Sequence, residues 1–375
     1  MEADRQAAAP PTQPRRRRLG RSGLWVNPLG FGAMHVWSEA DAETTLRAAF
    51  SAGLDFVDTS RAYGGSELAL GRALTGWDKV VVASKTMSRS RDAALYDVDR
   101  SRRYLGRERL LLYQLHDVGP DDWEEVLSAR GALAGLRAAQ EMGRVVFVGI
   151  SSHSAAVLDL AIVSGQFDTI QFAYNPFHPE AREIAAKAAA HDLGVIAMKP
   201  FGGFGMLSTL RLAEPPSSLD AALLLRYVLS DPHVSVVIPG IRFPSEVEQN
   251  LLAAQLPPLG EAERLAVEDE AASFLARMAL GDRYCRGCGY CLQNDGGGAC
   301  PAGIDIPRIL IDFYNPHRLL GDAQSRLRAR YVAYFVSHVG PEACTACGAC
   351  EMKCPYGLPV VEMLRETSRL LAAGL

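Results

Sequence analysis

Cysteine is missing from most of this 375-residue sequence: none lies before position 285, and all eight cysteines lie between 285 and 354. No apolar run approaches the about 18 consecutive residues that a membrane span needs. Charge of one sign is not in excess either, since 39 basic and 43 acidic residues give a net charge of -4. These absences predict a globular protein that binds neither membrane nor nucleic acid.

The same cysteine distribution argues against a secreted disulfide framework, which would spread through the fold and follow a signal peptide. The N-terminal segment is rich in Ala, Pro and Gln and ends in Arg15–Arg18. A twin-arginine export signal would require an apolar core after these arginines, and Leu19–Gly23 does not supply one. We therefore expect a disordered tail over residues 1–16 and a reducing, cytoplasmic compartment.

Short apolar runs alternate with helical patterns between residues 28 and 255, which is the pattern of a (β/α)8 barrel. The runs are mostly continuous, as expected for strands covered on both faces. A doubly wound open sheet is the alternative, but no GxGxxG turn follows the first run. The eight runs are Leu29–Met34, Phe56–Thr59, Val80–Lys85, Leu110–His116, Val145–Ser151, Thr169–Asn175, Val195–Lys199 and Val234–Ile238.

Five segments have the apolar spacing of amphipathic helices: Ala40–Ala52, Trp123–Met142, Ala181–His191, Leu219–Leu229 and Glu261–Leu280. Residues 18–26 predict a hairpin that turns at Ser22-Gly23 and caps the bottom of the barrel. The chain length favours one large and one small domain. We assign residues 17–280 to the α/β barrel and residues 281–375 to a smaller α-helical domain held by metal.

Three polar residues follow successive apolar runs: Asp58, Lys85 and His116. Each has an ordinary structural explanation when taken alone. Function in a barrel lies at the carboxyl ends of its strands, and the joint placement of the three at such ends predicts a catalytic site there. Tyr63 follows the first of them closely.

These stretches resemble the aldo-keto reductase superfamily. The resemblance rests on GLDFVDTSRAYGGSE around Asp58 and Tyr63, on SK at 84–85, on QLH at 114–116, on RRLGRSGL at the start, and on IPGIR with the later ExxQN. It implies NAD(P)H-linked carbonyl reduction or alcohol oxidation of a small molecule, with Asp58, Tyr63, Lys85 and His116 as the catalytic tetrad.

The chemistry needs these four residue types. A carbonyl that receives hydride needs a proton on its oxygen, and a tyrosine with a pKa near ~10 is a poor acid at neutral pH. We expect the ammonium of Lys85 to lower the pKa of Tyr63. Asp58 would hold that ammonium, and His116 would donate a hydrogen bond to the carbonyl.

The resemblance also implies a set of nicotinamide and nucleotide contacts, in which some positions depart from the family pattern. Met198 stands where an aromatic ring usually stacks, and Ser151-Ser152 stands where the family has Ser-Asn. NADP(H) is favoured over NAD(H), with Arg242 as the basic residue for a 2′-phosphate. The expected contacts are Ser151, Ser152, Gln171, Met198, Lys199, Gly240, Arg242, Gln249 and Asn250. The glycine-rich segment Phe201–Ser218 is expected to be a mobile loop that offers Phe201, Phe204 and Met206 to the pocket.

The cysteines form two runs, CxxCxxC followed by CP, and the second run has the bacterial ferredoxin spacing. Zinc is the alternative, because paired CxxC units also bind it, but it leaves the three-cysteine runs and their CP termini unexplained. Two [4Fe-4S] clusters are therefore predicted. In two-cluster ferredoxins the fourth cysteine serves the other cluster, which pairs Cys285, Cys288 and Cys291 with Cys354, and Cys344, Cys347 and Cys350 with Cys300.

Residues 304–320 and 323–339 between the runs have helical apolar spacing. The whole chain thus resembles aldo-keto reductases with a C-terminal 4Fe-4S dicluster domain. Three functions stay open: a nicotinamide-dependent oxidoreductase whose clusters fold the tail, an enzyme that exchanges electrons with ferredoxin or another carrier, and a regulatory protein with slow turnover. Hydride carries two electrons and each cluster carries one, and no flavin motif is visible.

Overall fold

The computed structural model describes residues 15–36, 39–203, 206–213, 216–278, 283–292, 300–314 and 339–372. Eight parallel strands in the order of the chain form the central sheet: β3 Phe31–Gly32, β4 Phe56–Asp58, β5 Val81–Thr86, β6 Leu110–Leu115, β7 Val145–Ser151, β8 Thr169–Ala173, β9 Gly194–Met198 and β10 Val236–Ile238. Parallel bridges join Leu29 to Val237 and Gly32 to Gly240, so the last strand returns to the first and closes the barrel. The predicted (β/α)8 barrel is confirmed.

Helices surround the barrel and bury their apolar faces against the strands. They are α1 Glu39–Ser51, α2 Ser66–Ala73, α3 Arg91–Leu105, α4 Trp123–Leu127, α5 Ala132–Glu141, α6 Ala155–Ser164, α7 Ala181–Ala190, α8 Met206–Leu212, α9 Ala221–Leu229, α10 Pro244–Gln255 and α11 Glu261–Arg277. Local sequence sets several boundaries. Asp220 caps α9 by accepting from the Leu223 amide at 2.8 Å, and α3 ends at Gly106 in the left-handed conformation.

The prediction of one helix over Trp123–Met142 is wrong, because the segment is split into α4 and α5. Residues 128–131 turn back toward the start of α3, where the Arg91 amide donates to the Arg130 carbonyl at 2.7 Å and Ser90 bridges to Gly131. A side chain at Gly131 would collide with the carbonyls of Glu125 and Val126. This contact between distant segments breaks a helix that the apolar spacing alone would continue.

The N-terminal hairpin closes the bottom of the barrel, as predicted. Strand β1 (Arg17–Arg18) pairs antiparallel with β2 (Trp25–Val26). Leu19 and Val26 are fully buried in an inner core with side chains that point into the barrel. Gly20 has φ +51 and lies so close to the backbone of Gly194 that no Cβ would fit, so this turn requires glycine.

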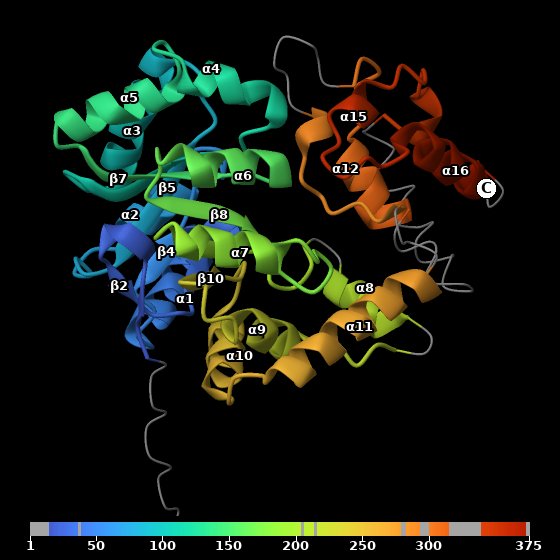
Figure 1. Cartoon of the computed structure of the whole chain (residues 1–375), viewed down its shortest axis with the longest axis horizontal. Helices are drawn as coiled ribbons and strands as arrows, with labels where there is room; N and C mark the ends of the chain where they lie inside the picture. The colour runs from blue at the N-terminus through green and yellow to red at the C-terminus, as the bar shows by residue number, and fades with distance from the viewer. Residues whose placement is uncertain are drawn as a thin grey trace, which may run out of the picture.

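The cysteine-rich region contains α12 (Ile306–Ile309), a π-helical turn over Leu310–Tyr314, α15 (Ala349–Met352) and α16 (Val360–Ala372). Figure 1 shows these helices gathered to one side of the barrel, in orange and red. The helix expected over 304–320 is described only as far as residue 314, and that expected over 323–339 lies outside the described residues except for its last. The tail expected over 1–16 lies outside them up to residue 14.

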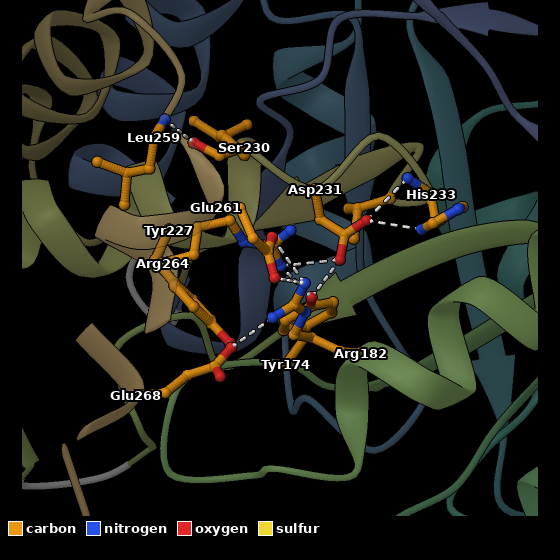
Figure 2. Close-up of polar contacts among 12 residues, drawn as sticks. Tyr174, Arg182, Tyr227, Ser230, Asp231, His233, Leu259, Glu261, Arg264 and Glu268 are labelled. Carbon is orange, nitrogen blue, oxygen red and sulfur yellow. Dashed lines mark hydrogen bonds and ion pairs between the residues drawn. The ribbon is translucent and has the colours of Figure 1, made fainter. Parts of the chain in front are cut away.

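A buried polar network fastens α11 to the barrel (Figure 2). Arg264 donates to Tyr174 Oη at 2.8 Å and to Asp231 Oδ2 at 3.0 Å, and Tyr174 also donates to Asp231. On the other side of the arginine, Tyr227 donates to Glu268 at 2.6 Å. Burial favours a higher pKa for Asp231, but its hydrogen bonds and Arg264 outweigh this and lower the pKa. The network therefore needs the charged carboxylate.

We expect Arg264→Met to lower the free energy of unfolding by about 3 kcal/mol, because it leaves a buried carboxylate without its cation. The matched control Arg18→Met removes the exposed pair with Asp192 and should cost less than about 1 kcal/mol. Urea unfolding followed by circular dichroism measures both. The difference between the variants should shrink as the pH falls from about 4, where this carboxylate becomes protonated in the unfolded chain, through the lowered pKa of Asp231 in the folded protein. Equal losses in the two variants at neutral pH would contradict this account of the network.

Candidate active site and cysteine cages

The four tetrad residues expected from the sequence lie together at the carboxyl ends of β4, β5 and β6. The Lys85 ammonium donates to Asp58 Oδ2 and to the Thr59 carbonyl, both at 2.8 Å. Its Nζ lies 5.0 Å from the centre of the Tyr63 ring, and the rings of Tyr63 and His116 meet edge to face at 5.5 Å. Three adjacent strands thus bring together side chains that are up to 58 positions apart in sequence.

Burial controls the protonation of this group. It raises the pKa of Asp58 and lowers that of Lys85, and in each case the charge of the partner opposes the shift. Burial also raises the pKa of Tyr63 well above its usual value, and the carboxylates of Asp58 and Asp117 raise it further. The expectation that Lys85 lowers this pKa is therefore not met here, because loss of water around the phenol dominates. Tyr63 keeps its proton, which suits a proton donor.

His116 is held by two residues that the sequence analysis missed. Ser60 Oγ lies 2.8 Å from Nδ1 of the imidazole, and burial lowers the pKa of His116 well below its usual value. The ring is therefore neutral, and a hydrogen bond donated by Ser60 would leave the proton on Nε2. Arg89 donates to the carbonyls of His116 and Asp117 at 3.0 and 2.9 Å. Ser60 lies in the same DTSR stretch as Asp58, whereas nothing local in the sequence marks Arg89.

A cavity of about 330 Å³, open to solvent, runs from the tetrad to the start of α10. Asp58 and Tyr63 line one end of it, and Arg242 lies at the other. Gln171 is oriented by Gln114, which donates to it at 2.8 Å. Seven of the nine expected nucleotide contacts line this cavity: Gln171, Met198, Lys199, Gly240, Arg242, Gln249 and Asn250.

The other two expected contacts, Ser151 and Ser152, lie elsewhere. Both are buried. The Ser151 hydroxyl accepts from the Asp117 amide at 2.9 Å, and the Ser152 hydroxyl donates to the Val118 carbonyl at 2.8 Å. These hydroxyls hold the loop after β6, and neither serine lines the cavity, although Ser151 pairs with Gln171 between β7 and β8. Their contact with the coenzyme stays a prediction.

The segment after β9 forms the wall opposite the tetrad. Phe201 lines the cavity as expected, together with Leu207, Ser208 and Arg211. Residues 206–212 form α8 rather than a loop, and Met206 is buried in the core instead of lining the pocket. Phe204 lies outside the described residues. Arg211 and Arg242 give this cavity positive charge, which favours an anionic ligand.

The cysteines surround two smaller cavities, grouped as the ferredoxin resemblance implies. We name them cage 1 and cage 2. Cage 1 is lined by Cys285, Cys288, Cys291 and Cys354. Cage 2 is lined by Cys300, Cys344, Cys347 and Cys350. The side chain of Ile306 borders both cages, so they are neighbours.

Cage 1 has sulfur donors and otherwise mostly apolar walls, among them Pro307, Leu310 and Val360. Burial raises the pKa of Cys285 to about 12 and that of Cys288 to about 11. Such thiols ionise only when a metal compensates their charge. Four thiolates in an apolar enclosure are the donor set of an iron–sulfur cluster, so the residues fit this group.

The loop that carries the first cysteine run packs directly on the rim of the barrel. Tyr290, between Cys288 and Cys291, accepts from the His153 amide at 2.8 Å and donates to the Val118 carbonyl at 3.2 Å. Tyr284 donates to the Gly202 carbonyl at 3.2 Å. The sequence placed these tyrosines in the metal-binding region but carried no signal that they face the barrel.

Comparison with known proteins agrees with this architecture. The family model of the aldo/keto reductase family matches residues 28–220, and that of the 4Fe-4S dicluster domain matches residues 284–359. L-galactose dehydrogenase of Arabidopsis thaliana is 27% identical over 300 residues, which cover 68% of this chain and 93% of that protein. Pyridoxine 4-dehydrogenase of Escherichia coli is 26% identical over 259 residues, 62% of this chain and 90% of that protein.

A solved structure shows the same fold. Aldo-keto reductase AKR11C1 from Bacillus halodurans, in its holo form, matches with a TM-score of 0.60 at 23% identity over 68% of this chain and 96% of its own. The fold and strand-end site define an oxidoreductase enzyme. The chain belongs to the aldo/keto reductase family and carries a 4Fe-4S dicluster domain at its C-terminal end. Within the described residues, no helix is both long and apolar enough to cross a bilayer.

Proposed function

We propose that this enzyme catalyses NADPH-linked reduction of a small carbonyl compound, or oxidation of the corresponding alcohol, with Tyr63 as the proton donor or acceptor. The observation that carries the proposal is the buried contact of Lys85 with Asp58 beneath Tyr63, beside a cavity that Gln171, Arg242 and Asn250 also line. NADH remains an alternative coenzyme.

Each tetrad residue has its own role in the reduction. Bound NADPH would supply the hydride to the carbonyl carbon. Tyr63 holds a proton at its hydroxyl because its pKa is raised, and it passes this proton to the oxygen as negative charge develops there. The phenolate that remains lies beside the Lys85 ammonium, which stabilises it. His116 is neutral and orients the carbonyl by a hydrogen bond from its free ring nitrogen.

The pocket walls bind and orient the coenzyme. Gln171 presents its side-chain amide at the tetrad end, which suits the nicotinamide carboxamide, and Met198 can pack against the ring. Arg242 would pair with a 2′-phosphate, since its guanidinium lies at the far end of the cavity and its backbone is held by Glu246 at 2.6 Å. Gln249 and Asn250 would contact the adenine.

We further propose that each cysteine cage holds one [4Fe-4S] cluster, with Cys285, Cys288, Cys291 and Cys354 as ligands in cage 1, and Cys300, Cys344, Cys347 and Cys350 in cage 2. A single zinc ion holds its sulfurs at about 2.3 Å, and in the described part of the chain no three potential ligands converge on one ion in this way.

The proposed boundary between the barrel (17–280) and the cluster domain (281–375) falls within residues 279–282, outside the described ranges. Clusters with eight cysteines suit a reducing cytoplasm.

A second candidate function is one-electron exchange with a ferredoxin-type partner through the clusters. The packing of the cage 1 loop on the barrel rim favours it. Cys347→Ser would separate the two functions. In the relay, this change in cage 2 stops turnover driven by reduced ferredoxin and spares nicotinamide-driven turnover. If reduced ferredoxin supports no turnover of the wild-type enzyme, the relay fails.

Tyr63→Phe should lower the carbonyl reduction rate by about 10²–10⁴-fold, because the positioned proton donor is lost. NADPH affinity, measured by fluorescence titration, should change little. The matched control is Tyr96→Phe, which removes a hydroxyl from a side chain that is 58% exposed on α3 and should leave the rate unchanged. Turnover of Tyr63→Phe at the wild-type rate would exclude Tyr63 as the proton donor.

Protein isolated without oxygen should contain about eight irons and eight inorganic sulfides per chain, as two [4Fe-4S] clusters require. Elemental analysis and sulfide determination measure the content, and visible absorbance should accompany it. Stoichiometric zinc in a colourless protein would refute the assignment of both cages.

A further inference from the structure

Two residues on the barrel rim adopt a backbone conformation that side chains disfavour, and both face the cage 1 loop. Asp117 directly follows the β6–His116 segment with φ +54, and Lys199 directly follows β9 with φ +55. Such conformations persist only where the surroundings enforce them. For Lys199, Asn175 donates to its carbonyl at 2.9 Å and the Gly202 amide donates at 3.0 Å. Its backbone is therefore fixed.

This backbone directs the Lys199 side chain from the nucleotide pocket to the cysteine loop. The residue lines the cavity beside Met198, yet its ammonium donates to the Gly287 carbonyl at 3.1 Å and lies 3.3 Å from His153 Nε2. Gly287 lies between Cys285 and Cys288. One side chain thus lines the pocket and donates to the backbone of the loop that carries the first cysteines of cage 1.

We infer that Lys199 couples the two sites: its ammonium stabilises the reduced state of the cluster in cage 1, and a nucleotide in the pocket changes that stabilisation. The inference rests on the proposed function, since it requires both the cluster and the nucleotide. An electron added to the cluster places negative charge beside the ammonium, which raises the reduction potential. A ligand that contacts the lysine stem alters the position or solvation of the same charge.

The coupling must work in both directions. If nucleotide binding changes the equilibrium constant for cluster reduction by some factor, reduction changes nucleotide affinity by the same factor. The affinity of the enzyme for its coenzyme would therefore depend on the redox state of a cluster outside the barrel. This holds whether or not electrons pass between the two sites.

The test is a titration of the anaerobically isolated full chain with dithionite as the one-electron donor, followed by electron paramagnetic resonance. It is run with and without the hydride-inert analogue tetrahydro-NADP. Lys199→Met should lower the reduction potential of one cluster by about 59 mV. This shift corresponds to a tenfold change in the equilibrium constant of a one-electron reduction. The other cluster should not move. The analogue should shift the midpoint of the same cluster in the wild type and not in Lys199→Met.

Two further variants sharpen the result. Lys199→Arg keeps the cation and should retain most of the wild-type midpoint. Lys187→Met removes an exposed lysine that pairs with Asp159 on the outer helices and should change neither midpoint. Equal midpoints in the wild type and Lys199→Met, with or without the analogue, would overturn the inference.

The wild type alone provides a check that does not depend on how the variants fold. Affinity for tetrahydro-NADP should differ between the oxidised and the dithionite-reduced protein by the factor that the potential shift gives. Equal affinities overturn the coupling. Iron content and analogue binding are measured on the same samples: absence of either refutes the proposed function, and with it the coupling, whereas their presence without a shift refutes the coupling alone.

Discussion

The buried ion pair between Lys85 and Asp58 is the constraint on which the active site depends. Both side chains are fully or almost fully excluded from water, and each charge is tolerable there only because the other lies 2.8 Å away. The pair joins the ends of two neighbouring strands at the place where the chain leaves β4. Tyr63, on the loop that follows, is half-buried with its ring centre 5.0 Å from the ammonium, and its raised pKa keeps its proton in place.

The cysteine-rich region takes part in the architecture of this site, because its first loop forms part of the rim of the barrel. Tyr284 and Gly287 contact the segment that follows β9, and Tyr290 contacts the segments that follow β7 and β6. Each is a hydrogen bond to backbone or to a buried side chain, and so depends on both regions folding. The dicluster domain is thus attached directly to the rim that carries the candidate active site.

Much of this could be predicted from the sequence where the signal is local. Continuous apolar runs gave the eight strands, strand-end positions brought Asp58, Lys85 and His116 together, and cysteine spacing gave the grouping around the two cages. The failures lie where distant segments decide the outcome. The break before Gly131 depends on pairing with the start of α3. Arg89 binds the carbonyls of His116 and Asp117 from a position that no local motif marks. The pKa of Tyr63 depends on burial, which no residue spacing shows.

We propose that one chain carries a coenzyme-binding barrel and, packed on the rim of this barrel, a domain with two iron–sulfur clusters. The most direct measurement is anomalous diffraction at the iron absorption edge from crystals grown without oxygen and soaked with NADP⁺. The account predicts one iron peak in each cage, with the nicotinamide ring between Met198 and Tyr63 in the same map. Iron in neither cage, or a nucleotide bound away from Tyr63, would contradict it.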